Sequence, residues 1–539
     1  MKKNTKKLVN FIAVVVIIAV MVIAKVTGAK ADTFWSLVPP LIAIGLALVT
    51  KETYSSLFIG IVSGAILISD FSVAGSIDNT VNSIIEAVKG TAGIFVFLVI
   101  LGTVVALLNK VGGSRAFGEW AEKNVKTREG AMFATFILGV LIFVDDYFNC
   151  LTVGSVMKPV ADKKKVSRAK LAYLIDATAA PVCMIAPVSS WAAAVSSYTE
   201  GTEYSGIELF IRAIPYNFYS ILTLVFIVCI IFMKFDYGSM RIHEANALLR
   251  DDLYTSGEKN ESINVEVSSK GKVIDLVIPV IVLIVACIAG LLYIGGFGKN
   301  GVNIVTAFSE TDATVGLPWG GIIALIIIIV YLMARKLVSF KDAMDSIPQG
   351  FNAMVPAILI LTFATALKSI TQSMGVSQYV KTVVGGSASE FAMFLPAVIF
   401  IIACGLAFAT GTSWGTFGIL IPIVINIFEP GSNLMIVGMS ACLAGAVCGD
   451  HCSPISDTTI MSSAGGQCNH INHVSTQIPY ALSVASISFV LYLIIGILEV
   501  IGLDKFIWLT IPFGVVVVIV FLFIVKTIVK HKNNGEIYR

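Results

Sequence analysis

The sequence predicts an all-α polytopic membrane protein with about 12 transmembrane spans, built as two inverted repeats that each contain a re-entrant hairpin and a broken helix. Three observations predict this fold class. Of 539 residues, 57% are hydrophobic and 13% are charged, and the mean hydropathy is +0.89, whereas soluble domains carry roughly 25% charged residues. Apolar stretches of about 20 residues recur along the chain. Short polar motifs of the first half return in the second half in the same order.

Twelve apolar stretches have the length of a membrane span. They cover residues 8–27, 33–50, 54–70, 91–109, 169–200, 208–233, 273–295, 317–334, 353–373, 433–464, 476–500 and 505–527. Two further stretches, 130–157 and 390–428, are too long for one helix and carry polar clusters midway, around Asp145 and around Thr412. Lys and Arg flank 130–157 on both sides, so both of its ends are predicted to be cytoplasmic and the stretch to enter and return as a hairpin.

These features divide the chain into five predicted parts. The parts are an N-terminal extra span (1–32), a first inverted repeat (33–233, hairpin 130–157, broken helix 169–200), a cytoplasmic loop (234–272), a second inverted repeat (273–500, hairpin 390–428, broken helix 433–464), and a C-terminal extra span with a tail (501–539). The first apolar run is longer than the core of a usual signal peptide, so an uncleaved span is favoured over a cleavable one. The basic clusters then place both termini in the cytoplasm and the multi-pass chain in the plasma membrane.

The internal repeat is visible as ordered motif matches. Ser83-Ile84 returns as Ser346-Ile347, Thr152-x-Gly154 as Thr416-x-Gly418, and Ala186-Pro187-Val188-Ser189 as Ser453-Pro454-Ile455-Ser456. Each unit holds an odd number of spans plus a hairpin, so the two units are predicted to insert upside down relative to each other. Inverted repeats place substrate and ion sites where the halves meet. The polar stretches around Ser83 and Ile347 are expected to be separate interfacial helices.

The stretch from Gly449 to Thr459 is the predicted working centre. It brings two carboxylates, a histidine and several hydroxyls between apolar helices, where an ionised side chain costs roughly 2.5–3.5 kcal/mol and usually faces a polar cavity. Pro454 cannot donate a backbone hydrogen bond, so a helix entering this stretch must break and free its backbone carbonyls. Broken helices at the midplane are where secondary transporters bind ions.

Four polar clusters, two from each half, are predicted to converge at the midplane and to bind a cation or substrate. Their side chains are Asp145, Asp146, Asn149, Asp176, Ser189, Thr412, Ser413, Thr416, Asp450, Ser453, Ser456, Asp457 and Thr458. Sodium prefers such hard oxygen ligands. A carboxylate that releases its proton when sodium arrives would couple the two ions. His451 is a second candidate for proton coupling, because an unperturbed histidine titrates near neutral pH.

Structural roles for some of these residues remain open. Asp145 or Asp146 could cap the second arm of the first hairpin, and Asp457 could cap the helix that restarts after Pro454, which is compatible with ion binding. The charged side chains of Lys158, Lys368 and Glu429 are expected to reach the membrane interface. His470 and His473 are expected in a loop, in contact with solvent.

The motifs of the second half resemble those of a known family. Gly411-Thr412-Ser413-Trp414-Gly415-Thr416 with Pro422, followed by the stretch from Gly449 to Thr459, is similar to the signature of the NhaC family of sodium/proton antiporters, within the ion transporter superfamily. The resemblance extends over about 35–500. It implies a scaffold and a transport bundle, usually in a homodimer, with sodium beside Asn149 and Ser413 and cation and proton exchange at Asp450 and Asp457.

The predicted function is therefore secondary active exchange of sodium for protons by alternating access. Sodium is the coupling ion, held by Asn149, Asp176, Ser413, Asp450 and Asp457, and the protons are coupled through Asp450, Asp457 and His451; no other cofactor is expected. The alternative is sodium- or proton-coupled carriage of a small carboxylate or amino acid, as in malate–lactate exchange. An enzyme is disfavoured because Pro454 separates Asp450 from Asp457, and a channel because inverted halves suit alternating access. The lipid bilayer is an expected partner. The net charge of +3 is too small to predict binding of nucleic acid.

Overall fold

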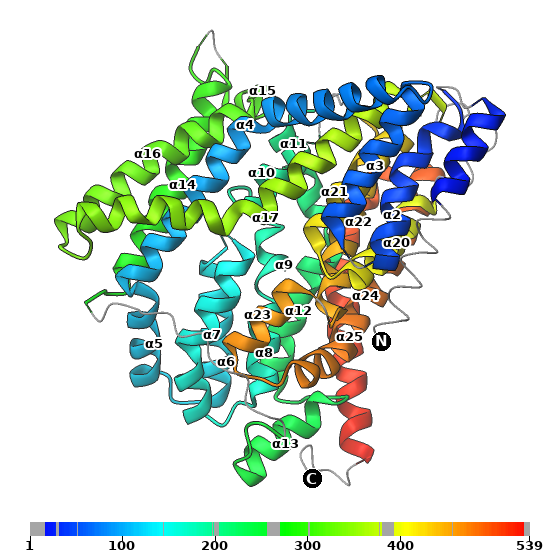
Figure 1. Ribbon diagram of the computed structural model, residues 1–539. Helices are drawn as coiled ribbons and strands as arrows, with labels where there is room; N and C mark the ends of the chain where they lie inside the picture. The colour runs from blue at the N-terminus through cyan, green and yellow to red at the C-terminus, as the bar shows by residue number, and fades with distance from the viewer. Residues whose placement is uncertain are drawn as a thin grey trace.

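The computed structural model describes residues 17–28, 32–50, 52–143, 145–196, 198, 204–255, 270–299, 302–376, 378–379, 393–454 and 456–532, and their regular secondary structure is entirely helical (Figure 1). The first half contains η1 (Phe34–Leu37), α2 (Val38–Thr50), α3 (Thr53–Ile68), α4 (Val73–Val111), α5 (Gly113–Asn124), α6 (Arg128–Leu141), α7 (Asp146–Lys163), α8 (Arg168–Asp176), α9 (Ala180–Cys183), α10 (Ser190–Ser196), α11 (Gly206–Ala213), η2 (Ile214–Tyr216), α12 (Phe218–Met233) and α13 (Met240–Arg250). The second half contains α14 (Ile274–Ile294), α15 (Ile304–Glu310), α16 (Ala313–Ala334), α17 (Phe340–Ser373), α20 (Leu395–Thr410), α21 (Ser413–Ile427), α22 (Asn433–Cys452), α23 (Asp457–Gly465), α24 (His470–Val500), η3 (Asp504–Leu509) and α25 (Thr510–Lys532).

The described residues contain six helices that are long and apolar enough to cross a membrane, or eight if two bent pairs each count as one span. The bent pairs are Gly206–Tyr216 with Phe218–Met233, at 49°, and Phe340–Pro356 with Ile358–Ser373, at 43°. The chain is thus a multi-pass membrane protein, and the number of twelve spans stays a prediction. Residues 8–16 of the predicted first span, 256–269 of the predicted loop and 533–539 of the tail lie outside the described residues.

The helices α4 and α17 differ from the prediction for their polar beginnings. The stretches around Ser83 and Ile347 were expected as interfacial helices between spans. The first is continuous with the apolar span that follows it, and the second is joined to its span at the 43° bend, while their interfacial position stays a prediction. In α4 no proline interrupts the 39 residues. In α17 Pro348 and Pro356 lie inside the helix, and the chain bends without ending it.

The helices α6 and α7 form an antiparallel pair joined by a short tip around Asp145. Their outer ends meet, because Arg128 donates to the carbonyl oxygen of Lys165 at 3.3 Å and Lys164 donates to that of Lys126 at 3.1 Å. The tip is therefore the point of this pair that lies farthest from its basic ends.

The helices α20 and α21 form a second pair, with its tip at Gly411 and Thr412. Gly411 adopts φ of +70°, a conformation that favours glycine, and Thr412 caps α21 through the N–H of Gly415. Helix α20 runs alongside α22, since a Cβ on Gly445 would lie 2.4 Å from the carbonyl oxygen of Phe400 and one on Gly449 would lie 2.1 Å from that of Cys404. The order of these contacts shows that α20 and α22 are parallel. Phe428, just after α21, contacts Gly438 near the start of α22, so the end of α21 lies near the start of α20 and the two helices are antiparallel.

Two helices are interrupted beside these tips. Helix α8 ends at Asp176, and the chain continues through the single turn α9 to α10, which Ser189 caps by accepting from the N–H of Ala192 at 3.2 Å. Helix α22 ends at Cys452, and Ser456 caps α23 by accepting from the N–H of Thr459 at 3.2 Å. The hydroxyl groups thus satisfy backbone groups that a break leaves open.

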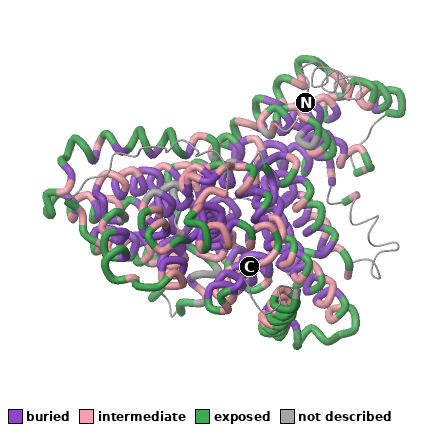
Figure 2. Tube along the Cα trace, turned by 90° about the horizontal axis from the view of Figure 1, so that it is seen from below, coloured by how far each residue is buried: buried purple, intermediate pink, exposed green. Residues whose placement is uncertain are grey.

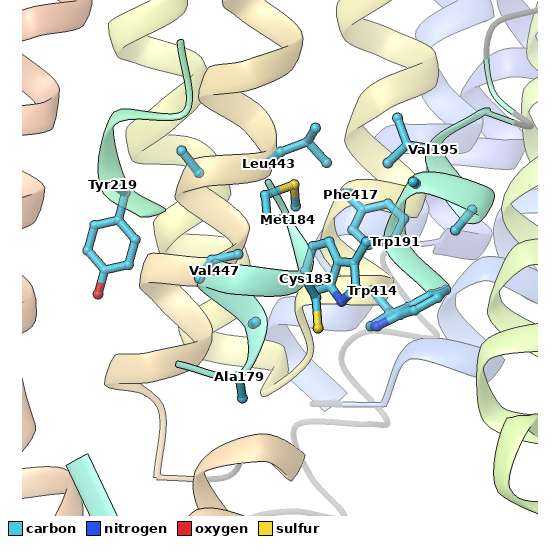
Figure 3. Packing of buried hydrophobic residues seen from close by; sticks show 14 of the residues in the cluster. Ala179, Cys183, Met184, Trp191, Val195, Tyr219, Trp414, Phe417, Leu443 and Val447 are labelled. Atoms are coloured by element: carbon cyan, nitrogen blue, oxygen red, sulfur yellow. The ribbon is translucent and has the colours of Figure 1, made fainter. Parts of the chain in front are cut away.

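Buried residues concentrate where these interrupted elements meet, whereas exposed residues lie on the outer helices (Figure 2). Figure 3 shows part of this core: Trp191 of α10 lies beside Trp414 and Phe417 of α21, with ring centroids 5.8 and 5.1 Å away. The aromatic contact joins an element of the first half to one of the second half. It fixes the second hairpin tip against α10.

The crossing of α4 and α17 gives a prediction about packing. A Cβ on Gly102 would lie 2.4 Å from the carbonyl oxygen of Gly350, whereas a Cβ on Gly45 in α2 would meet nothing within 4 Å. We expect Gly102→Leu to lower the free energy of unfolding by about 1–3 kcal/mol more than Gly45→Leu, because the two helices must separate. Thermal unfolding of both variants in detergent measures this, and equal midpoints would contradict the described packing.

Candidate functional site

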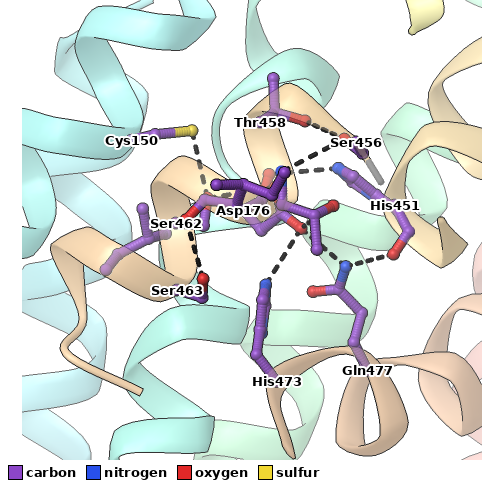
Figure 4. A network of polar contacts seen from close by, with 12 residues as sticks. Cys150, Asp176, His451, Ser456, Thr458, Ser462, Ser463, His473 and Gln477 are labelled. Carbon is purple, nitrogen blue, oxygen red and sulfur yellow. Dashed lines mark hydrogen bonds and ion pairs between the residues drawn. The ribbon is translucent and has the colours of Figure 1, made fainter. Parts of the chain in front are cut away.

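The Asp176 carboxylate is the centre of a buried polar network (Figure 4). Its Oδ2 atom accepts from Gln477 at 2.7 Å, from Thr459 at 3.1 Å and from His473 at 3.3 Å. Its Oδ1 atom accepts from Ser462 at 3.1 Å. All four donors belong to the second half of the chain, so this one carboxylate of the first half joins the two halves.

The local sequence explains how four donors converge on one residue. Asp176 is the last residue of α8, where the helix dipole disfavours a negative charge and donors from elsewhere are needed. Thr459 and Ser462 are three residues apart in α23, and His473 and Gln477 are four residues apart in α24, so each pair lies on one helix face. These two faces meet around Asp176.

His451 links the same network to α12. Its Nε2 atom lies 3.2 Å from the backbone oxygen of Asp176, and its Nδ1 atom lies 3.2 Å from the hydroxyl of Tyr219. A carbonyl oxygen only accepts, so Nε2 carries the hydrogen and, in a neutral ring, Nδ1 accepts from Tyr219. Gln477 also donates to the backbone oxygen of His451 at 2.6 Å, which fixes the end of α22 to α24.

A second group of carboxylates lies at the first hairpin tip and the end of α22. Asp145, Asp146 and Asp450 are all buried, and Asp146 is within electrostatic range of the other two. Trp191 of α10 donates to Asp146 Oδ2 at 3.2 Å, and Thr458 of α23 donates to Asp450 Oδ2 at 2.5 Å. Tip and broken helices of both halves therefore contribute to one region.

Asn149 has a distinctive arrangement beside this group. Its amide nitrogen lies within hydrogen-bond distance of three carbonyl oxygens, those of Gly139 at 2.7 Å, Ile142 at 3.0 Å and Thr178 at 3.1 Å. The amide is thereby oriented with Oδ1 pointing away from these oxygens, and that buried atom has no hydrogen-bond partner within the described residues. A buried acceptor oxygen without a partner can bind a cation or accept a hydrogen bond from a substrate.

The second hairpin tip contributes hydroxyl groups, most of which form hydrogen bonds with backbone groups. Thr412 caps α21, and Thr416 donates to the backbone oxygen of Thr412 at 2.8 Å. Ser413 is buried at the start of α21. Buried Trp414 Nε1 and Ser190 Oγ have no partner within the described part of the chain.

The predicted residues thus fall into groups that the breaks bring together. Ser189 and Ser456 cap restarted helices, and Ser453 donates to the backbone oxygen of Phe408 at 2.7 Å. The side chain of Asp457, the first residue of α23, lies outside the described part. No cluster of three His, Cys, Asp or Glu side chains suited to a bound metal ion is found in the described ranges.

Sequence reasoning missed several buried polar residues. His473 was expected in a loop in contact with solvent, but it lies in the first turn of α24 and contacts Asp176 with 0% exposure, so that expectation is wrong. Lys368 was expected to reach the interface, yet it is 3% exposed and donates to the backbone oxygen of Tyr198 at 3.0 Å. Gln477, Thr459 and Ser462 were not selected. The regular spacing of polar residues in otherwise apolar helices was the signal for them.

Comparison with known proteins gives consistent results. A profile described as the Na+/H+ antiporter family matches residues 191–497. An uncharacterized protein of Haemophilus influenzae is 37% identical over 483 residues, which is 86% of this chain and 91% of that protein. The malate-2H(+)/Na(+)-lactate antiporter of Bacillus subtilis is 33% identical over 173 residues, 31% of this chain and 36% of its own.

A solved structure has a similar fold. The Alcanivorax borkumensis YdaH transporter, described as having an unusual topology, aligns with a TM-score of 0.54 and 13% identity over 86% of this chain and 98% of its own. At this identity the likeness concerns the fold.

The Asp176 network predicts a difference between two adjacent serines. Ser462 donates to Asp176, whereas Ser463 donates to the backbone oxygen of Ile460 and lies 3.2 Å from His470 Nδ1, with no hydrogen bond to Asp176 within the described residues. We expect Ser462→Ala to lower the free energy of unfolding by about 1–3 kcal/mol, because a buried carboxylate loses a donor, and Ser463→Ala to cost less. Thermal unfolding in detergent compares the two, and a larger loss in Ser463→Ala would argue against the network.

Proposed function

This chain belongs to the Na+/H+ antiporter family, of the NhaC type, and on that premise we propose that it exchanges sodium for protons by alternating access. The family and the transporter of similar fold support a secondary transporter. The observation that carries the finer proposal is the convergence of buried carboxylates at the helix breaks with the amide oxygen of Asn149, which has no hydrogen-bond partner within the described residues.

Sodium binding is supported by the kind of atoms available. Asn149 Oδ1 is fixed in direction by three carbonyl oxygens and lies in a hairpin whose tip also carries Asp145 and Asp146. A hard cation needs several oxygen ligands of this type. In this proposal Asn149, Ser413, Asp450 and Asp457 hold the ion. Asp176 belongs to the same predicted set, but sodium must displace one of its four donors to reach it.

Proton coupling follows if sodium and proton compete for the same carboxylates. Asp450 and Asp457 are the proposed sites of this competition, because they lie on either side of the break between α22 and α23. When sodium leaves, the carboxylate in a poorly solvated site loses its counter-charge. Its neutral, protonated form is then lower in free energy than its charged form, so it takes up a proton. His451 lies next to Asp450 in the chain and is bonded to the Asp176 network, which suits a residue that passes protons onward.

Matching contacts in the two halves support the proposed inverted repeat. A Cβ on Gly154 would lie 2.4 Å from the carbonyl carbon of Gly465, and one on Gly418 would lie 3.3 Å from the hydroxyl of Tyr198. When the hairpin motifs are aligned, Gly154 corresponds to Gly418, and when the broken helices are aligned, Tyr198 corresponds to Gly465. Each hairpin therefore packs on the broken helix of the other half, as a pseudo-two-fold arrangement requires.

A small organic acid or amino acid remains the alternative cargo. Trp414 Nε1 and Ser190 Oγ are buried donors without partners within the described residues, and donors of this kind suit a carboxylate. The malate-2H(+)/Na(+)-lactate antiporter among the relatives points the same way. Against it, the carboxylates of Asp145, Asp146 and Asp450 would repel an anion at close range.

Assembly and location complete the proposal. We place the chain in the plasma membrane as a homodimer with both termini in the cytoplasm. The basic residues at the outer ends of α6 and α7 support this orientation, because Lys and Arg accumulate on the cytoplasmic side. Sodium and protons are the exchanged ions, and the proposal requires no other cofactor.

The test is proton flux in proteoliposomes that contain the pure protein and a pH-sensitive dye. Added sodium should change the internal pH, and Asp450→Asn or Asp457→Asn should reduce the rate at least tenfold, because a neutral amide cannot exchange a proton. Asp312→Asn is the matched control, since this exposed carboxylate caps α16, a role that Asn also fills. Wild-type exchange in both core variants would refute the assignment. Flux that needs an added carboxylate or amino acid would establish the alternative.

A further inference from the structure

The segment from Lys234 to Thr255, which follows α12 and contains α13, is held by buried polar contacts to elements of both halves. We call it the docking segment. It lies at the same end of the molecule as the outer ends of α6 and α7 (Figure 1). This is the end that the basic residues predict to be cytoplasmic.

Asp236 makes two of these buried contacts. Its Oδ1 atom lies 2.5 Å from Lys170 Nζ of α8, with side-chain exposures of 4% and 1%, and it also accepts from the hydroxyl of Tyr480 in α24. The ammonium group of Lys170 lies over the rings of Tyr480 and Tyr173, at 5.2 and 5.7 Å. One carboxylate of the docking segment therefore connects α8 with α24.

Glu244 fixes the beginning of α8. Its Oε1 atom accepts from the backbone N–H of Ser167 at 2.9 Å, and its carboxylate forms an ion pair with Arg128 at the start of α6. The neighbouring Arg168 donates its backbone N–H to the oxygen of Leu253 at 2.9 Å. The docking segment thus holds the first hairpin and the first broken helix together.

Helix α24 is held by a second set of contacts. Tyr237 donates to the hydroxyl of Ser483 at 2.8 Å, and Ser239 donates to the backbone oxygen of Ser475 at 2.7 Å. The rings of Tyr237 and Tyr480 lie 4.9 Å apart. These contacts continue along the helix that presents His473 and Gln477 to Asp176.

The position of these contacts relative to Asp176 suggests what they do. Lys170 and Asp176 are six residues apart in α8, about 9 Å along the helix axis. Gln477 and Tyr480 are three residues apart in α24, so their side chains are neighbours on one face of that helix. The ring of Tyr173 packs on that of Tyr480, with centroids 5.0 Å apart. A buried layer of aromatic side chains and an ion pair therefore joins α8 to α24 next to the Asp176 network.

We propose that the docking segment is a gate that closes the Asp176 network toward this end of the molecule. The gate opens when Asp236 separates from Lys170 and Tyr480, which frees the parts of α8 and α24 around these two residues to move apart. The inference rests on the proposed function only in requiring that water and ions reach the Asp176 network during transport. It does not depend on which ion or solute is carried.

Cys150 provides a built-in reporter for this gate. Its sulfur atom lies 3.1 Å from Ser462 Oγ, beside Asp176, and the residue is fully buried. With the other eight cysteines replaced by serine or alanine, its rate of modification by a membrane-impermeant maleimide reports access from the side to which the reagent is added. Adding the reagent separately to each side of oriented vesicles tells the two routes apart.

The gate predicts a specific difference between two aspartates of the docking segment. Asp236→Asn should raise the modification rate of Cys150 from the gate side about tenfold, because the ion pair with Lys170 is lost. Asp251→Asn should leave it unchanged, since Asp251 is 71% exposed and pairs with Lys165 at the surface. Equal rates in Asp236→Asn and the unsubstituted protein would overturn the proposal, and so would acceleration only from the opposite side.

A tether tests the same gate with Asp236 intact. Ser239→Cys and Ser475→Cys, placed in a background without other cysteines and joined by a short bifunctional thiol reagent with a reducible link, should stop solute and ion flux. Reduction of the link should restore it. Undiminished flux in the tethered protein would overturn the gate. If the untethered protein shows no sodium-dependent flux, the proposed exchange fails, while the Cys150 rates still decide whether the gate exists.

Discussion

The arrangement of this protein depends on a buried carboxylate that takes its hydrogen bonds from distant parts of the chain. Asp176 ends a helix of the first half, and its four donors lie between 283 and 301 residues later in the sequence. A buried carboxylate without donors is costly, so α23 and α24 must remain close to α8 whenever Asp176 is charged. A change at this carboxylate therefore affects both halves at once.

The helix breaks make such a centre possible. Where α8 and α22 end, backbone groups are left open, and the polar side chains that satisfy them are also those that gather at the site. Ser189 and Ser456 restart α10 and α23 in the same way, while Asn149 uses its amide nitrogen on the open carbonyl oxygens and leaves Oδ1 available. The same residues thus stabilise the helix breaks and form the proposed ion site. The ion is proposed to bind the side-chain oxygen atoms that do not bond to the backbone.

Part of this arrangement could be predicted from the sequence. Polar clusters and Pro454 stand out in apolar stretches, so the breaks near Asp145, Thr412 and Asp450 were recognisable. His473 and Gln477 were not, because a polar helix start resembles a solvated loop until the partner across the fold is known. The long α4 was also missed, since a change from polar to apolar residues does not by itself end a helix. The burial of Lys368 could not be predicted either, because a charged side chain is buried only where it has partners, and its partner lies far away in the chain.

The central claim is that ion binding at the tips and the Asp176 network act as one unit across the two halves. Hydrogen exchange measured by mass spectrometry, with and without sodium, tests it most directly in the peptides that contain Asn149 and Asp176 and in those that contain Asp450 and Gln477. Sodium should slow exchange in both sets together, and Asp176→Asn should remove the joint effect while the first tip retains its own protection. Protection of one set alone in the unsubstituted protein, or of both sets in Asp176→Asn, would contradict this account.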